Sequence, residues 1–157
     1  MIVTINTDAS FSKEHQRGSF AFWIVCDKFK ILKSGILRRQ VIRPEVAEFK
    51  CIINALHILL NENISTVTRI VINTDCLNVI HLINNDKKEI KKYQLAQWGN
   101  TLVETFKRMR EENEIMHIPI TMKHVKSHSG IGDARSYVNE WCDTQAKLAL
   151  KRALNLS

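Results

Sequence analysis

The order of the apolar patterns along the chain constrains its fold more than any other feature. Three runs rich in β-branched and aromatic residues come first, joined by short links, and such runs predict strands of an antiparallel meander. The spacing of apolar residues then becomes helical, and strand-like and helix-like segments alternate to the end. The expected strands span 2–8, 19–26, 30–37, 69–74 and 118–125, and the expected helices span 44–61, 76–84, 95–109 and 137–154.

This order predicts an α/β fold with a five-stranded mixed sheet, in which three antiparallel strands precede alternating strands and helices that flank the sheet. Pro119 near the start of the last strand indicates an edge position or a strand beginning. The segment DKKEIKKY, residues 86–93, is interpreted as a charged linker. Because no linker is long enough to divide the chain, residues 1–157 are expected to form a single domain.

The charge balance favours a polyanionic partner. Twenty-three Lys and Arg residues against 16 Asp and Glu residues give a net charge of +7. Nucleic acid is the commonest partner of a domain this basic, although a basic surface that only confers solubility is the alternative.

The cysteines argue against a structural zinc site and against a disulfide framework. Cys26, Cys51, Cys76 and Cys142 form no CxxC pair, so reduced thiols are expected. The first residues lack the basic and apolar regions of a signal peptide, and no run approaches the length of a membrane span. We therefore expect a cytoplasmic protein without membrane contact.

The stretch Ile-Asn-Thr-Asp occurs twice, and each copy brings an aspartate to the end of a strand-like run, Asp8 in the first and Asp75 in the second. If the two strands are parallel neighbours, both carboxylates lie at the sheet edge where open α/β sheets bind ligands. Two such carboxylates repel, so that one keeps its proton unless a divalent cation such as Mg²⁺ binds. The alternative is that each aspartate caps the next element.

Two further acids and a histidine extend this pattern. Glu48 lies one turn into the first expected helix among apolar residues, whereas Glu45 fits an ordinary first-turn acid. Asp143 lies early in the last expected helix, where a first-turn acid is again the alternative. His128 lies in a polar, glycine-bearing loop, where a mobile base or acid can move, while His124 closes a strand and fits a structural role.

Together these residues resemble the ribonuclease H family, in particular the catalytic domain of the type 1 enzymes, over nearly the whole chain. Each motif is weak alone, but the five occur in the family's order on the expected elements. They are Thr7-Asp8-Ala9-Ser10, Ala47-Glu48, Thr74-Asp75-Cys76, Val125-Lys126-Ser127-His128-Ser129-Gly130 and Asn139-Glu140-Trp141-Cys142-Asp143. The chain departs from the family pattern at Ala9 and Ser127, where glycine is usual, and at Arg43-Pro44-Glu45, which replaces an Asn-rich stretch.

The resemblance implies a ribonuclease H-like fold and an endonuclease that hydrolyses the RNA strand of RNA–DNA hybrids, leaving 5′-phosphate and 3′-hydroxyl ends. It implies two Mg²⁺ ions, or Mn²⁺, with Asp8 bridging both ions, helped by Asp75, and with Glu48 and Asp143 each completing one side. His128 would assist proton transfer or product departure. The implied partner is the hybrid itself, and no obligate protein partner is evident.

Contacts to nucleic acid are expected from small polar and basic residues around these acids and from a lysine run that resembles a shortened form of the family's basic handle. They are Ser10, Lys13, Arg43, Lys87, Lys88, Lys91 and Lys92. A solvated loop is the alternative for the lysine run. Trp98 and Trp141 could stack on bases, but their helical apolar spacing favours core packing.

Three other functions stay open at this point. A different nuclease on the same fold is one, although Asp8-Ala9-Ser10 lacks the Asp-x-Glu motif of proofreading exonucleases. A non-catalytic nucleic-acid-binding module is the second, and the presence of all four acids argues against it. A structural domain whose acids only cap helices is the third.

Overall fold

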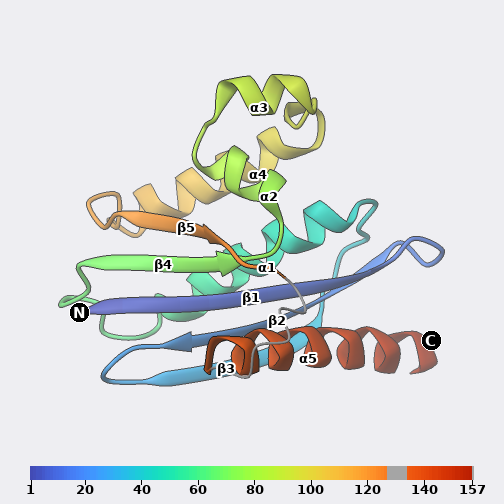
Figure 1. Ribbon diagram of the computed structural model, residues 1–157, viewed down its shortest axis with the longest axis horizontal. Helices are drawn as coiled ribbons and strands as arrows, with labels where there is room; N and C mark the ends of the chain where they lie inside the picture. Colours follow the sequence, from blue (N-terminus) through green and yellow to red (C-terminus); the bar gives the residue numbers. More distant parts are fainter. Residues whose placement is uncertain (127–133, 157) are drawn as a thin grey trace.

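The computed structural model describes the backbone of residues 1–126 and 134–156, which form a five-stranded sheet flanked by helices (Figure 1). The strands are β1 (Ile2–Ser12), β2 (Arg17–Val25), β3 (Lys30–Ile36), β4 (Arg69–Thr74) and β5 (Ile120–His124). The helices are α1 (Pro44–Leu59), α2 (Leu77–Ile83), α3 (Lys87–Lys92), α4 (Ala96–Glu112) and α5 (Ala134–Leu156). Within the described residues, every helix is too short or too polar to span a bilayer.

The sheet has the strand order β3-β2-β1-β4-β5. Its strand pairing is mixed, as the sequence predicted. The first three strands pair antiparallel, because short turns join them. β4 then pairs parallel to β1, and β5 pairs parallel to β4 at the edge of the sheet. The two strands that carry the Ile-Asn-Thr-Asp stretches are therefore parallel neighbours, which is the condition for their two aspartates to lie at one edge of the sheet.

Alternation along the central strands builds two apolar layers. Val3 and Ile5 of β1 face α1 and contribute to the larger core cluster together with Phe49 and Leu56. On the opposite face, a smaller cluster joins β2 to α5 and consists of Ala21, Trp23, Cys142 and Ala146. Figure 1 shows α5 over β2 and β3 on one face of the sheet and α1 with α4 on the other.

The interpretation of residues 86–93 as a linker is wrong, because this segment contains the short helix α3. Asp86 is its N-cap residue, and its side chain accepts a hydrogen bond from the backbone N–H of Glu89. Lys91 and Lys92 occupy the last turn, where cations are favourable near the helix C-terminus. Ile90 packs against the main core and attaches α3 to it. The surrounding charged residues made this apolar contact hard to predict from the sequence.

The placement of Asp8 at the end of a strand is also wrong. β1 continues to Ser12 because its antiparallel pairing with β2 runs on to the pair Ser12↔Arg17. The parallel pairing with β4 ends earlier, at Asn6↔Asn73. Asp8 therefore lies within a strand, just beyond the point where that strand loses one of its two neighbours.

Two other boundaries bear on the acids. α5 begins at Ala134, earlier than predicted, so Asp143 lies well inside the helix and is not a first-turn acid. Asp75 follows β4 directly, as predicted, but Cys76 and not Asp75 is the N-cap residue of α2. The capping alternative therefore does not hold for Asp75 at the N-cap position.

The burial of each leucine predicts how much a Leu→Ala substitution lowers the free energy of unfolding. Leu56 on α1 is fully buried, so Leu56→Ala should lower the free energy of unfolding by about 2–5 kcal/mol. Leu77 is 47% exposed, and Leu77→Ala should change the same quantity by about 0.5 kcal/mol or less. Urea unfolding of both variants measures the difference, and equal costs would contradict the placement of α1 in the core.

Candidate functional site

Three acids that are far apart in the sequence converge beside the central strand. Asp8 comes from β1, Glu48 from α1, and Asp75 from the residue that follows β4. One carboxylate oxygen from each residue lies within 4.8 Å of the others. The structure thus brings together three of the four acids predicted from the sequence in a single cluster, which we call the acid cluster.

The early end of β4 explains how the acid cluster forms. Beyond Asn6, the described residues give β1 a strand neighbour only on the β2 side, and the backbone N–H of Ala9 donates to side chains. It donates to Oδ1 of Asp8 at 2.9 Å and to Oε1 of Glu48 at 3.3 Å. A single backbone donor therefore holds a carboxylate from the strand and a carboxylate from the helix. Sequence reasoning missed this role of Ala9.

Burial and mutual repulsion raise the pKa values of the cluster. The pKa of Asp8 rises from 3.8 to about 7, chiefly because burial disfavours its charge, and then because of the negative charge of Asp75. The pKa of Glu48 lies well above its ordinary value for the same first reason, with added repulsion from Asp8 and Asp75. The expectation that crowded carboxylates keep a proton thus agrees with these shifts.

The chemistry of the acid cluster suits a divalent cation. Oε2 of Glu48 is buried and has no hydrogen-bond partner within the described part of the chain. A buried carboxylate oxygen in that state is costly unless a cation or a donor satisfies it. Mg²⁺ and Mn²⁺ prefer oxygen ligands, which all three residues offer. The residues present therefore fit the metal that the sequence predicted.

Asp143 approaches the cluster from the opposite face of the sheet, on α5. It raises the pKa of Asp8 further, through its charge and through a side-chain hydrogen bond. Its Oδ2 also accepts a hydrogen bond from Nζ of Lys147, one turn later, at 2.9 Å. Lys147 was missed in the sequence, although the spacing of four residues between an acid and a lysine was a usable signal.

The asparagines of the two Ile-Asn-Thr-Asp stretches also have a structural role. Asn6 and Asn73 are register partners, and Nδ2 of Asn73 donates to Oδ1 of Asn6 at 2.9 Å. The hydroxyl of Thr7 donates to the backbone carbonyl of Asn73 at 3.4 Å. These buried bonds join β1 to β4 directly before Asp8 and Asp75, so the asparagines of both stretches help to hold the two strands together.

His124 holds the other side of Asp75. Its Nε2 lies 3.1 Å from the backbone carbonyl oxygen of Asp75, and since a carbonyl can only accept, Nε2 carries the hydrogen. This contact agrees with the structural role expected of His124. His128 lies outside the described residues, so its predicted role stays a prediction.

Arg43, a predicted nucleic-acid contact, is held by two neighbours. Its guanidinium pairs with Glu45 at 2.9 Å and lies 5.5 Å from the ring centroid of Trp98. Trp98 itself packs against the main core, as predicted. Trp141 packs edge-on to Trp23 with ring centroids 5.5 Å apart, which also agrees with the prediction. Neither ring is therefore a free stacking platform.

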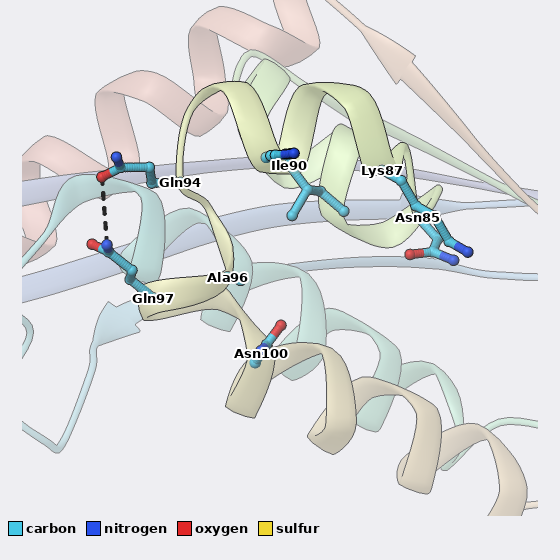
Figure 2. A pocket seen from close by; sticks show the side chains of 8 residues that line it. Asn85, Lys87, Ile90, Gln94, Ala96, Gln97 and Asn100 are labelled. Atoms are coloured by element: carbon cyan, nitrogen blue, oxygen red, sulfur yellow. Dashed lines mark hydrogen bonds between the residues drawn. The ribbon is translucent and has the colours of Figure 1, made fainter.

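The remaining predicted contacts fall in two places. Ser10 lies on β1 two residues beyond Asp8, and Lys13 lies in the exposed turn that follows β1. Lys87 and Lys91 line an open pocket of about 470 Å³ between α3 and α4 (Figure 2). Four amide side chains also line it, those of Asn85, Gln94, Gln97 and Asn100. The pocket contains none of the acids, so it is separate from the acid cluster.

The sheet order and the acid cluster define an α/β domain with a buried carboxylate centre at its central strand. The model of the RNase H family matches residues 1–151, and the chain therefore belongs to the ribonuclease H family. No curated protein sequence matches the chain.

Solved structures resemble this fold at low sequence identity. LC11-RNase H1 from compost, in complex with an RNA/DNA hybrid, is 14% identical with a TM-score of 0.62, over 97% of this chain and 99% of that chain. RNase H1 of the halophilic archaeon Halobacterium salinarum is 17% identical with a TM-score of 0.59, over 97% and 99%. The RNase H domain of prototype foamy virus is 14% identical with a TM-score of 0.55, over 94% and 92%.

The raised pKa of Asp8 predicts a pH dependence of stability in the presence of chelator. Between about pH 4 and 7, folded Asp8 holds a proton that unfolded Asp8 has released, so its contribution is complete below pH 4 and is lost as the pH rises through 7. The stability of the wild type relative to Asp8→Asn should therefore fall over this range, by up to about 1.4 kcal/mol per pH unit.

Urea unfolding at several pH values measures this difference. The exposed Asp27 provides a matched control, because Asp27→Asn should not reproduce the effect. A difference between the wild type and Asp8→Asn that stays constant from pH 5 to 8 would contradict the shift.

Proposed function

We propose that this chain is an endonuclease that hydrolyses the RNA strand of RNA–DNA hybrids. The observation that carries the proposal is the acid cluster in a chain of the ribonuclease H family, with an Oε2 of Glu48 that has no hydrogen-bond partner among the described residues. The hybrid bound to LC11-RNase H1 supports the substrate class. The net charge of +7 supports a polyanionic substrate in general.

Asp8, helped by Asp75, would hold two divalent ions, Mg²⁺ or Mn²⁺, and Glu48 and Asp143 would each complete one side of the site. Such a pair of ions stabilises the attacking and leaving oxygens of an in-line displacement at phosphorus. The residues of the chain prepare the site before any ion binds. The N–H of Ala9 orients one oxygen of Asp8 and one of Glu48, and it leaves Oε2 of Glu48 available as a ligand.

Protons must leave the acid cluster for it to bind cations. Burial and repulsion raise the pKa of Asp8 to about 7, so in the absence of ions its carboxyl holds a proton at mildly acidic pH. Cation binding then competes with that proton, so affinity should rise with pH. We further propose that His128 assists proton transfer or product departure, and that the products carry 5′-phosphate and 3′-hydroxyl ends.

The hybrid would be held mainly by its phosphates. Two lysines of the pocket between α3 and α4, Lys87 and Lys91, place positive charge beside amide donors on an open surface. Lys88 and Lys92 on the same helix, Arg43 at the start of α1, and Ser10 and Lys13 along β1 and its turn would add contacts. Contacts of this kind give affinity that does not depend on base sequence.

Cleavage of an end-labelled RNA strand in an RNA–DNA hybrid tests the proposal. With Mg²⁺ or Mn²⁺ we expect internal cuts in the hybrid but not in single-stranded RNA, and their loss with chelator. Asp75→Asn should lower the rate by more than about 100-fold, since removing groups that merely orient metal ligands costs roughly 10–100-fold. Asp27→Asn, an exposed aspartate, is the matched control and should retain the rate.

Two outcomes would contradict the proposal. Undiminished turnover by Asp75→Asn would remove the metal-ligand assignment. No cleavage with either ion, together with salt-sensitive binding to the hybrid, would instead indicate a binding module that keeps the fold.

The pocket lysines predict a change in salt dependence. The double variant Lys87→Gln/Lys91→Gln should bind the hybrid more weakly, and the slope of log K against log salt should become shallower by about 1 for each phosphate that the variant no longer neutralises. Binding titrations between low and physiological salt, in chelator, give both quantities. Lys107→Gln/Lys151→Gln changes two exposed lysines outside the pocket and serves as the control. Equal slopes for the two double variants would argue against binding of the hybrid at the pocket.

A further inference from the structure

A buried thiol lies directly behind Asp8, on the helix that supplies Glu48. Cys51 follows Glu48 on α1 by three residues and is 0% exposed. Its Sγ lies 3.4 Å from the backbone carbonyl oxygen of Asp8 and 3.4 Å from that of Ala21. Asp8 and Ala21 are register partners on β1 and β2. One side chain of α1 therefore contacts both strands at the level of the acid cluster.

Both neighbours of this sulfur are hydrogen-bond acceptors, so only a donor suits the position. A thiol donates weakly through its S–H, whereas a thiolate could not donate at all. As a donor to these carbonyls, the neutral thiol also adds no charge to a site already crowded with carboxylates.

The position of α1 along β1 decides whether the acid cluster forms. The N–H of Ala9 donates to Oε1 of Glu48 over 3.3 Å, which is already long for a hydrogen bond. A shift of α1 along β1 would therefore break this bond. Residues three apart on a helix lie on the same side, so a contact at Cys51 restrains Glu48 as well. The apolar contacts of α1 fix its depth in the core, but they are non-directional and set its axial position less sharply.

We propose that Cys51 is a positioning residue, which anchors α1 to β1 at Asp8 and so sets the separation of the Asp8 and Glu48 carboxylates that a divalent cation requires. The inference rests on the proposed function of the acid cluster as a metal site. It concerns the backbone carbonyls of Asp8 and Ala21 and gives Cys51 no contact with metal or substrate.

The other cysteines show what sets Cys51 apart. Cys142 on α5 also donates to β1, but to the carbonyl of Asn6 and at 3.6 Å, away from the carbonyl of Asp8. Cys26 lies just after β2, is half-buried, and packs at the margin of the main core. Cys26 is therefore suitable for a control with the same change of residue type at a position remote from the acids.

The test uses the full chain without nucleic acid and measures Mn²⁺ and Mg²⁺ binding by titration calorimetry. Cys51→Ala and Cys51→Val both remove the donor, one leaving space and the other filling it, and each should weaken cation binding by roughly fivefold to tenfold, the size of one lost hydrogen bond. Cys51→Ser keeps a donor and should bind within about twofold of the wild type. Cys26→Ala should be unchanged.

The pattern across the variants separates positioning from packing. Wild-type affinity in Cys51→Val or Cys51→Ala would overturn the proposal. Equal losses in Cys51→Ser and Cys51→Ala would also overturn it, because a packing defect and not a missing donor would then be the cause. Circular dichroism checks that each variant is folded, and if Cys51→Ala is not, the comparison of Cys51→Val with Cys51→Ser decides.

The proposed function can fail separately. Wild-type protein that binds neither ion would overturn both the metal site and the role of Cys51. Wild-type protein that binds ions normally, with Cys51 variants that bind equally well, would overturn only the positioning role. A second readout is the hydrogen exchange rate of the Ala9 amide, which should rise in Cys51→Val and return toward the wild-type rate in Cys51→Ser.

Discussion

The parallel pairing of β1 with β4, and above all the place where it stops, is the constraint on which the rest of the site depends. The pairing ends at Asn6↔Asn73, while β1 continues along β2 to Ser12. A strand that outlasts one neighbour leaves backbone donors without a strand partner, and a buried donor must find another acceptor. At Ala9 the acceptors are carboxylates, so the need to satisfy one amide draws Asp8 and Glu48 together. Asp75 joins them because its own strand has just ended.

This arrangement opposes folding in one respect, since it buries like charges. Asp8 is only 8% exposed and responds with a pKa of about 7, and Glu48 is shifted in the same direction. Native proteins tolerate such local strain when the surrounding structure determines the geometry, and here two packed layers of helices do so. Lys147 supplies a positive charge on the α5 side, where it pairs with Asp143 and also interacts with the charge of Asp8. A bound cation would therefore relieve the remaining repulsion and stabilise the folded state by linkage.

Much of the fold could be predicted from the sequence, because periodicity reports which faces are buried. The change from strand to helical spacing predicted the meander and the alternating half. The repeated Ile-Asn-Thr-Asp brought its two aspartates to one sheet edge only on the condition that β1 and β4 are parallel neighbours, and the structure meets that condition. The sequence could not place Asp8 within its strand, since the length of β1 is set by its pairing with β2. α3 was not predicted because its many charged residues favoured a linker, although Asp86 is its N-cap residue and Ile90 packs against the main core. The roles of Ala9 and Cys51 depend on backbone groups, which leave no pattern in the side chains.

On the proposed function, Arg43 would contact a phosphate of the substrate with a guanidinium that two neighbouring side chains already hold in place. Its side chain is 47% exposed and pairs with Glu45, whose side chain is 18% exposed. Ion pairs of this exposure contribute little to stability, between about 0 and 1 kcal/mol, so a phosphate can replace Glu45 at small cost. The stack on Trp98 would meanwhile keep the guanidinium in place. On the proposed function, Arg43 at the N-cap of α1, in the segment Arg43-Pro44-Glu45 that departs from the family pattern, would therefore supply an exchangeable phosphate contact on the helix that carries Glu48.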